Sequence, residues 1–221
     1  MKNIKTVLEE KGITGEFASK LIEANEIFFE IYEECGRSFI EGDGSYLFEG
    51  GVYEYCAGMY PKQELLYNLA KESKSTLEIG TYMGHSLLIM LLGNPELKIT
   101  SIDLVDKYAL PSINVLRKRF PKSEIEFIHG DSLKVLPGIT TPKFDLFHID
   151  GHHLEEHIRQ EVEHCKRLST HNVYGKDAAR IVFDDIHCCK MLVFEIVANK
   201  EVLQYINPDC IWTNAYVEFY L

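Results

Sequence analysis

The chain lacks several features that would mark other classes of protein. It has no run of Lys or Arg, and 34 acidic against 23 basic residues give a net charge of −11. Phosphate binding needs a basic surface, so a nucleic-acid substrate is not expected. No apolar run approaches the length of a membrane span, and mixed polar residues follow Met1, so neither a membrane span nor a signal-peptide core is expected.

Cysteine is present but forms no metal or disulfide pattern. The six cysteines contain no C-x-x-C pair and no regular framework, which indicates reduced thiols and a cytoplasmic location. Hydrophobic residues make up 46% of 221. That is enough for an ordinary globular core.

Strand-like and helix-like segments alternate along the chain. Strands are expected near 76–80, 98–103, 124–128, 144–149, 180–184 and 211–221, and helices near 85–93, 110–119, 154–168 and 189–199. This alternation predicts an α/β fold with a doubly wound, mostly parallel sheet and helices on both faces. Before it come a helix over 15–34 capped by Thr14, a segment over 36–60 rich in glycine and tyrosine, and a helix that Pro61 opens.

A glycine turn follows the first expected strand. In Leu77–Ser86 an apolar strand runs into Gly80, then Gly84, then an apolar helix. Glycine permits a sharp turn and a close approach to a ligand. Asp103 ends the next strand about 20 residues later, where a nucleoside-binding βαβ unit places its ribose carboxylate. The other interpretation of Asp103 is a strand-end acid that faces water.

Other strands also end in polar residues. Ligands bind at the carboxyl ends of strands in such sheets, so these ends predict the site. The residues found there are Glu78, Gly80, Asp103, Asp131, Ser132, Asp150, Asp184 and Asp185.

The residues of the glycine turn carry a family resemblance. Glu78–Ser86, Glu-Ile-Gly-Thr-Tyr-Met-Gly-His-Ser, resembles the first motif of class I S-adenosylmethionine-dependent methyltransferases. More narrowly, it is similar to the catechol and caffeoyl-CoA O-methyltransferases and their sugar- and macrolide-modifying relatives. The resemblance runs from about Pro61 to Ile186. It implies a Rossmann-like methyltransferase domain over 61–221 and an N-terminal helical or lid extension over 1–60.

The resemblance also implies a cofactor site for S-adenosylmethionine. Asp103 would hold the ribose, while Asp131 and Ser132 would contact adenine, although either residue could equally cap a helix. Tyr82 and Ser86 match positions that touch the carboxylate of the methionine moiety. The cofactor-binding residues expected on this basis are Glu78, Gly80, Tyr82, Gly84, Ser86, Asp103, Asp131, Ser132 and Asp150.

The resemblance further implies a divalent metal ion, with Mg²⁺ expected. Its ligands would be Asp150, Asp184 and Asp185, an all-oxygen set. The catechol branch has a lysine base three residues after the first acid, and here that position is His153. Histidine at this place favours a sugar or polyketide hydroxyl over a simple catechol as substrate, with His153 as the catalytic base. The other interpretation of the acids is an unliganded pocket lining.

Three further interpretations stay open. His153–His157 reads H-x-x-E-H, a zinc-protease pattern, but it directly follows a strand in an alternating chain. A metal-independent methyltransferase or a non-catalytic nucleoside-binding module would also fit the glycine turn. The family's Gly-Gly turn before the paired acids is replaced by the longer 174–179, which puts the placement of Asp184 in question. A small-molecule hydroxyl substrate and a homodimer are the expected partners.

Overall fold

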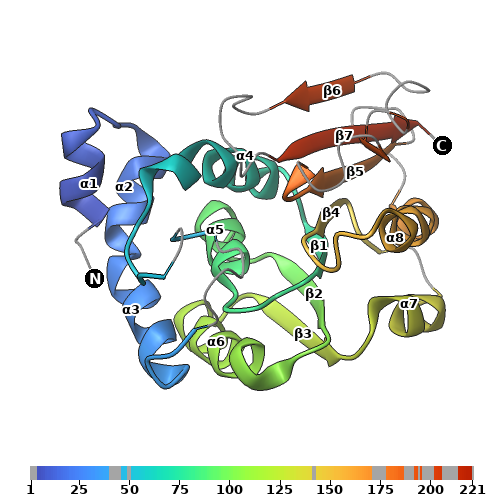
Figure 1. The fold of residues 1–221 in the computed structure, drawn as a ribbon, viewed down its shortest axis with the longest axis horizontal. Helices are drawn as coiled ribbons and strands as arrows, with labels where there is room; N and C mark the ends of the chain where they lie inside the picture. The colour runs from blue at the N-terminus through green and yellow to red at the C-terminus, as the bar shows by residue number, and fades with distance from the viewer. Residues whose placement is uncertain are drawn as a thin grey trace.

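The protein is described by a computed structural model. It describes residues 4–39, 46–48, 51–140, 143–170, 178–186, 192, 193, 195, 202–205 and 214–220. Within these residues a seven-stranded sheet has the order β3-β2-β1-β4-β5-β7-β6 (Figure 1). The expected doubly wound, mostly parallel α/β fold is confirmed.

The five strands at the centre and one edge of the sheet are parallel. They are β1 (Ser75–Ile79), β2 (Lys98–Asp103), β3 (Glu124–His129), β4 (Leu146–Ile149) and β5 (Ala178–Phe183). The last strand, β7 (Ala215–Tyr220), pairs antiparallel with β5, and β6 (Val202–Tyr205) pairs antiparallel with β7. The strand expected over 211–221 is present in the described part, and β6 was not expected.

Helices cover both faces of the sheet (Figure 1). One face carries α4 (Tyr60–Lys71), α5 (His85–Gly93) and α6 (Asp106–Arg119), and the other carries α7 (Ser132–Val135) and α8 (Glu155–Leu168). Two short 3₁₀ turns, Ala57–Met59 and Leu136–Gly138, precede α4 and follow α7. Because side chains alternate along a strand, Leu146 packs in the core under α5 and Phe147 in the core under α8.

The N-terminal segment packs onto the α5 face. It forms α1 (Ile4–Glu10), α2 (Glu16–Glu23) and α3 (Asn25–Glu34). The single helix expected over 15–34 is therefore wrong, because the chain breaks at Ala24 and the Asn25 side chain accepts a hydrogen bond from the Ile4 amide. Gly15, not Thr14, stands at the helix start, without a side-chain cap. The division into 1–60 and 61–221 stays a prediction.

Aromatic residues of the expected loop segment lie in the core. Tyr46, Phe48, Tyr53 and Tyr55 are buried, and the Tyr53 hydroxyl lies 2.9 Å from Nε2 of His85 at the start of α5. Burial lowers the pKa of His85 to about 3. The neutral ring therefore ties this segment to the helix that follows the glycine turn.

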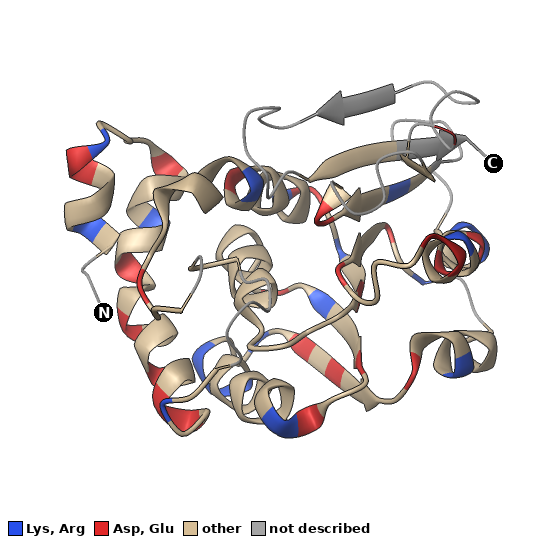
Figure 2. Ribbon diagram, viewed as in Figure 1, with Lys and Arg blue, Asp and Glu red and all other residues tan. Residues whose placement is uncertain are grey.

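Acidic and basic residues are interspersed along the helices and strands (Figure 2). On α3 and α6, for example, Glu30 pairs with Lys118 and Arg119. A span of lipid bilayer would need a longer and more apolar helix than any in the described residues. The expected cytoplasmic location stays a prediction.

Candidate active site at the carboxyl edge of the sheet

The glycine turn is locked against the neighbouring strands. The Gly80 amide donates to the Ile102 carbonyl at 2.8 Å, and the Asp150 amide donates to the Ile79 carbonyl at 2.8 Å. Gly80 has φ of 88°, and a Cβ there would lie 2.0 Å from the Asp150 carbonyl oxygen. Only glycine fits this position, because both the conformation and the space exclude a side chain.

Asp103 holds the turn through backbone amides. Its Oδ2 accepts from the amides of Thr81 and Tyr82, each at 2.7 Å, and its Oδ1 accepts from Val105 at 2.8 Å. A carboxylate offers about four acceptor positions, so about one remains for a ligand. If Asp103 accepts hydrogen bonds from both ribose hydroxyls, one hydroxyl must therefore share an acceptor position with one of these amides. The ribose role stays a prediction.

Glu78 and Ser86 belong to a buried polar network under α5. The Ser86 hydroxyl donates to Glu78, whose Oε1 lies 3.0 Å from His148 Nδ1. Tyr46 Oη lies 2.6 Å from His148 Nε2, and the Asn214 amide donates to the Tyr46 hydroxyl. Burial raises the pKa of Glu78, and Glu78 raises the pKa of His148 against the opposing effect of burial. These groups are linked to one another inside the protein, while Glu78 Oε2 and Asn214 Oδ1 have no hydrogen-bond partner among the described residues.

The residues after β3 make local contacts. Asp131 caps α7 by accepting from the Leu133 amide at 3.0 Å, as the capping interpretation predicted. Ser132 donates to Glu161 of α8 at 2.6 Å. Burial raises the pKa of Glu161 to about 7. The expected adenine contacts stay predictions.

The aromatic ring of Tyr82 lies beside the turn. Tyr82 has a positive φ of 44°, and its ring meets that of Tyr108 edge-on at 5.3 Å. Gly84 follows with φ of 65° and precedes the first residue of α5. The amides at the start of α5 therefore face the same edge as Asp103.

Three acids meet where β4 and β5 end. Asp150 follows β4, Asp184 and Asp185 follow β5, and the Asp184 amide donates to the Ile149 carbonyl at 2.9 Å. Burial and the Asp184 charge raise the pKa of Asp150 well above its usual range. The three acids therefore lie at the edge where the sequence predicts them, and their role as metal ligands stays a prediction.

A lysine from α4 pairs with one acid of this cluster, and it was not predicted. Lys62 Nζ lies 3.1 and 3.0 Å from the two carboxylate oxygens of Asp184, with both side chains almost wholly buried. Burial would raise the pKa of Asp184, but Lys62 outweighs it and lowers that pKa. Burial likewise opposes the charge on Lys62, yet Asp184, Asp150 and Asp185 raise its pKa. The ammonium is therefore kept.

The acids by themselves suit a hard divalent ion, but their arrangement does not. Both Asp184 oxygens already bind the Lys62 ammonium. Within the described ranges no three His, Cys, Asp or Glu side chains are placed to hold a metal ion. The site residues as they lie do not fit the expected Mg²⁺.

His153 lies beside the first acid, before α8 begins. Its Nε2 lies 3.7 Å from Asp150 Oδ1 and makes no hydrogen bond to any described residue. The protease interpretation placed His153 and His157 on one helix, whereas α8 starts at Glu155. His153 therefore stands at the strand-end edge, where a catalytic base was expected.

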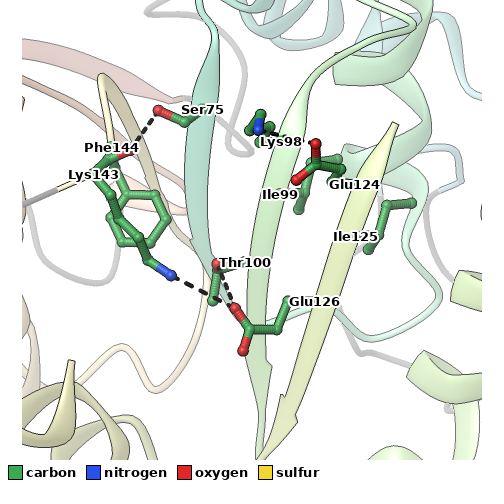
Figure 3. Close-up of a pocket in the computed structure, with 9 residues that line it drawn as sticks. All are labelled: Ser75, Lys98, Ile99, Thr100, Glu124, Ile125, Glu126, Lys143 and Phe144. Carbon is green, nitrogen blue, oxygen red and sulfur yellow. Dashed lines mark hydrogen bonds and ion pairs between the residues drawn. The ribbon is translucent and has the colours of Figure 1, made fainter. Parts of the chain in front are cut away.

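An open hollow of about 410 Å³ lies elsewhere (Figure 3). It sits over the first halves of β1, β2 and β3, where Glu126 contacts Thr100 at 3.3 Å and Lys143 at 3.6 Å. This is the end of the strands opposite to Gly80 and Asp103. The hollow is separate from the candidate site.

Two buried residues of the site, Lys62 and His148, were missed, although the sequence pattern around each of them indicates burial. Lys62 recurs with Leu66 and Leu69 at helical spacing, on the buried face of α4. His148 interrupts an apolar strand and is the register partner of Glu78, which interrupts another. A polar residue at a position patterned as buried needs a partner.

The fold is similar to that of solved methyltransferases. An O-methyltransferase from Bacillus cereus, solved in complex with SAH, superposes with a TM-score of 0.63 at 13% identity, covering 97% of this chain and 95% of that one. The arrangement described above is thus a fold that this chain shares with that O-methyltransferase.

Sequence comparisons lead to the family. Residues 77–186, about half of the chain, match the methyltransferase domain family Methyltransf_24. The chain is 39% identical over 83 residues to a caffeoyl-CoA O-methyltransferase-like protein of Arabidopsis thaliana, covering 36% of this chain and 35% of that protein. It is 32% identical over 111 residues to the O-methyltransferase hkm8 of Aspergillus hancockii, covering 48% and 43%. The matched part spans less than half of the length of these two relatives. The match to the family model shows that the chain belongs to the class I methyltransferases.

Proposed function

We propose that the protein is an S-adenosylmethionine-dependent O-methyltransferase that acts on a hydroxyl of a small molecule or sugar. The glycine turn carries the proposal: Gly80 lies against β4 and Asp103 holds the next two amides, at the edge where such folds bind ligands. The relatives named as O-methyltransferases support transfer to oxygen.

The residues that would hold the cofactor surround this turn. Asp103 offers its remaining acceptor position to the ribose, and the amides that begin α5 face the same edge. Gly80, Tyr82 and Gly84 shape the turn between them. Bound S-adenosylmethionine supplies a methyl group activated by its sulfonium. The glycine turn fits a nucleoside because it places backbone atoms, and not side chains, next to the ligand.

His153 is proposed as the base. His153 Nε2 would take the proton of the acceptor hydroxyl, and bound S-adenosylmethionine would supply the methyl group to that oxygen. This nitrogen makes no hydrogen bond to the described residues and so can accept a proton. Imidazole is the most common general base in enzymes, and Asp150 Oδ1 lies 3.7 Å from this nitrogen.

The form without a metal ion is favoured over the Mg²⁺-dependent form. Asp150, Asp184 and Asp185 would be the ligands of a metal ion, but Lys62 already binds both oxygens of Asp184. We therefore include no metal step in the proposed reaction. Chelation tests the dependence on Mg²⁺ that the sequence indicated: loss of methyl transfer in excess EDTA would favour the Mg²⁺-dependent form instead.

Calorimetric titration with S-adenosylhomocysteine tests the cofactor assignment. Wild type should bind, and Asp103→Ala should weaken binding about 10- to 100-fold, as expected for loss of hydrogen bonds to a charged group. Asp106→Ala is the matched control, since this exposed acid lies three residues further along the chain. Absence of binding to folded wild type would refute the proposal.

Methyl transfer from labelled cofactor to a panel of hydroxyl acceptors tests the reaction. His153→Ala should lower the rate by about 10²- to 10⁴-fold, the usual contribution of a general base. His164→Ala on α8 is the control. A non-catalytic module would bind the cofactor tightly and transfer no methyl group to any acceptor.

A further inference from the structure

The position of Lys62 is set by long-range packing. It lies in the first turn of α4, whose residues Gln63, Leu66 and Leu69 are also buried. The Arg180 guanidinium of β5 donates to the Leu69 carbonyl at 3.3 Å, which fixes α4 beside the strand that delivers Asp184. Lys62 therefore reaches the acids from a separate layer of the protein, 122 residues away in the chain.

The Lys62 ammonium is surrounded by carboxylates and by an aromatic ring, which are groups that attract a cation. Both oxygens of Asp184 bind it, and the ring centroid of Tyr46 lies 4.2 Å from Nζ. Asp150 and Asp185 add their negative charges. Gln63, next along α4, donates to the Tyr46 backbone carbonyl and thereby holds the backbone of Tyr46 beside α4. An aromatic face and carboxylates are both favourable partners for a buried cation.

We propose that Lys62 is the built-in cation of this site: its ammonium takes the place predicted for a divalent metal ion, and the enzyme works without one. Lys62 is then a positioning residue, since it acts through Asp184 and the neighbouring acids. The inference rests on the proposed function for its role in methyl transfer, but the occupancy of the cation position can be tested without any turnover.

A direct consequence concerns metal binding. Three neighbouring acids, one of them bound through both oxygens by a lysine, should gain affinity for a divalent ion when that lysine becomes neutral. Lys62→Met keeps a similar length and removes the charge. Wild type should then bind no Mn²⁺ at the acids, whereas Lys62→Met should bind it.

Mn²⁺ serves as the probe, followed by electron paramagnetic resonance and by thermal unfolding. With wild type the signal of free Mn²⁺ should be unchanged and the Tm constant. Lys62→Met should have a Tm lower by about 10 °C, because it leaves buried acids uncompensated, and saturating Mn²⁺ should return about half of that loss. Lys62→Arg should keep the behaviour of wild type.

Lys71→Met is the matched control. Lys71 lies on the same helix but pairs at the surface with Glu16. Its replacement should change neither Mn²⁺ binding nor, beyond a few degrees, the Tm.

Stoichiometric Mn²⁺ binding to wild type that disappears in Asp184→Asn would overturn the inference. So would folded Lys62→Met that binds no Mn²⁺. If Lys62→Met does not fold, the wild-type titration still decides. Methyl transfer by wild type should be unchanged in excess EDTA, and its loss would also refute the inference. Failure of the proposed function appears separately, as absence of S-adenosylhomocysteine binding.

Discussion

Two aspartates at the same edge of the sheet are held in different ways. Asp103 at the end of β2 accepts backbone amides from its own neighbourhood, the glycine turn and Val105. Asp184 at the end of β5 is compensated by a side chain from another layer, Lys62. The first arrangement follows from a short motif. The second exists only because α4 packs beside β5, so similar acids can carry different chemistry.

The largest loss of stability is expected at Gly80, where the glycine turn contacts the residues that follow β4. Gly80→Ala places a Cβ 2.0 Å from the Asp150 carbonyl oxygen and forces an unfavourable φ. We expect a loss of more than about 3 kcal/mol in the free energy of unfolding. Urea denaturation measures it. Gly138→Ala is the control, since nothing lies within 4 Å of a Cβ there. A small loss would mean that the turn and β4 are less closely packed than described.

Asp184→Asn tests the region that depends on tertiary packing. It leaves the Lys62 ammonium buried without its full partner, which should lower the free energy of unfolding by about 3 kcal/mol. The double variant with Lys62→Met should be more stable than the sum of the two single losses predicts. Urea denaturation of all four proteins gives this coupling. Glu16→Gln, which alters the exposed pair with Lys71, should cost less than about 1 kcal/mol. Additive losses would contradict a direct Lys62–Asp184 pair.

Glu161 is a buried acid that, among the described residues, is held neither by several backbone amides nor by a lysine. It accepts from Ser132, and its pKa is raised from 4.5 to about 7. A raised folded-state pKa means that its full contribution to stability is present below about pH 4.5 and is lost as the pH rises through 7.

Glu161→Gln removes this pH dependence. The variant should be more stable than wild type at pH 8, by on the order of 2 kcal/mol, and about equal at pH 4. Urea denaturation at the two pH values provides the comparison. Glu163→Gln, an exposed neighbour paired with Lys166, should show no such change. Equal differences at both pH values would exclude ionisation of Glu161 as the cause.

The order of strands and helices could be predicted because apolar periodicity is local. Strand β2 and helix α5 begin and end where the patterns indicate, and the three acids meet because parallel strands end at one edge. Strand β6 and the break at Ala24 were missed, since pairing and packing with distant residues decide them. The predicted contacts with cofactor and acceptor stay predictions.

The sequence by itself determined the class of protein: the Glu78–Ser86 motif, the alternation of elements and the acids at strand ends all act over short distances. Tertiary structure alone decided what compensates those acids. A lysine in a helix pattern looks like a solvated side chain, and only the packing of α4 against β5 brings Lys62 to Asp184. The reason is physical: once buried, a charge requires a partner, and the partner is whichever group the fold brings within reach.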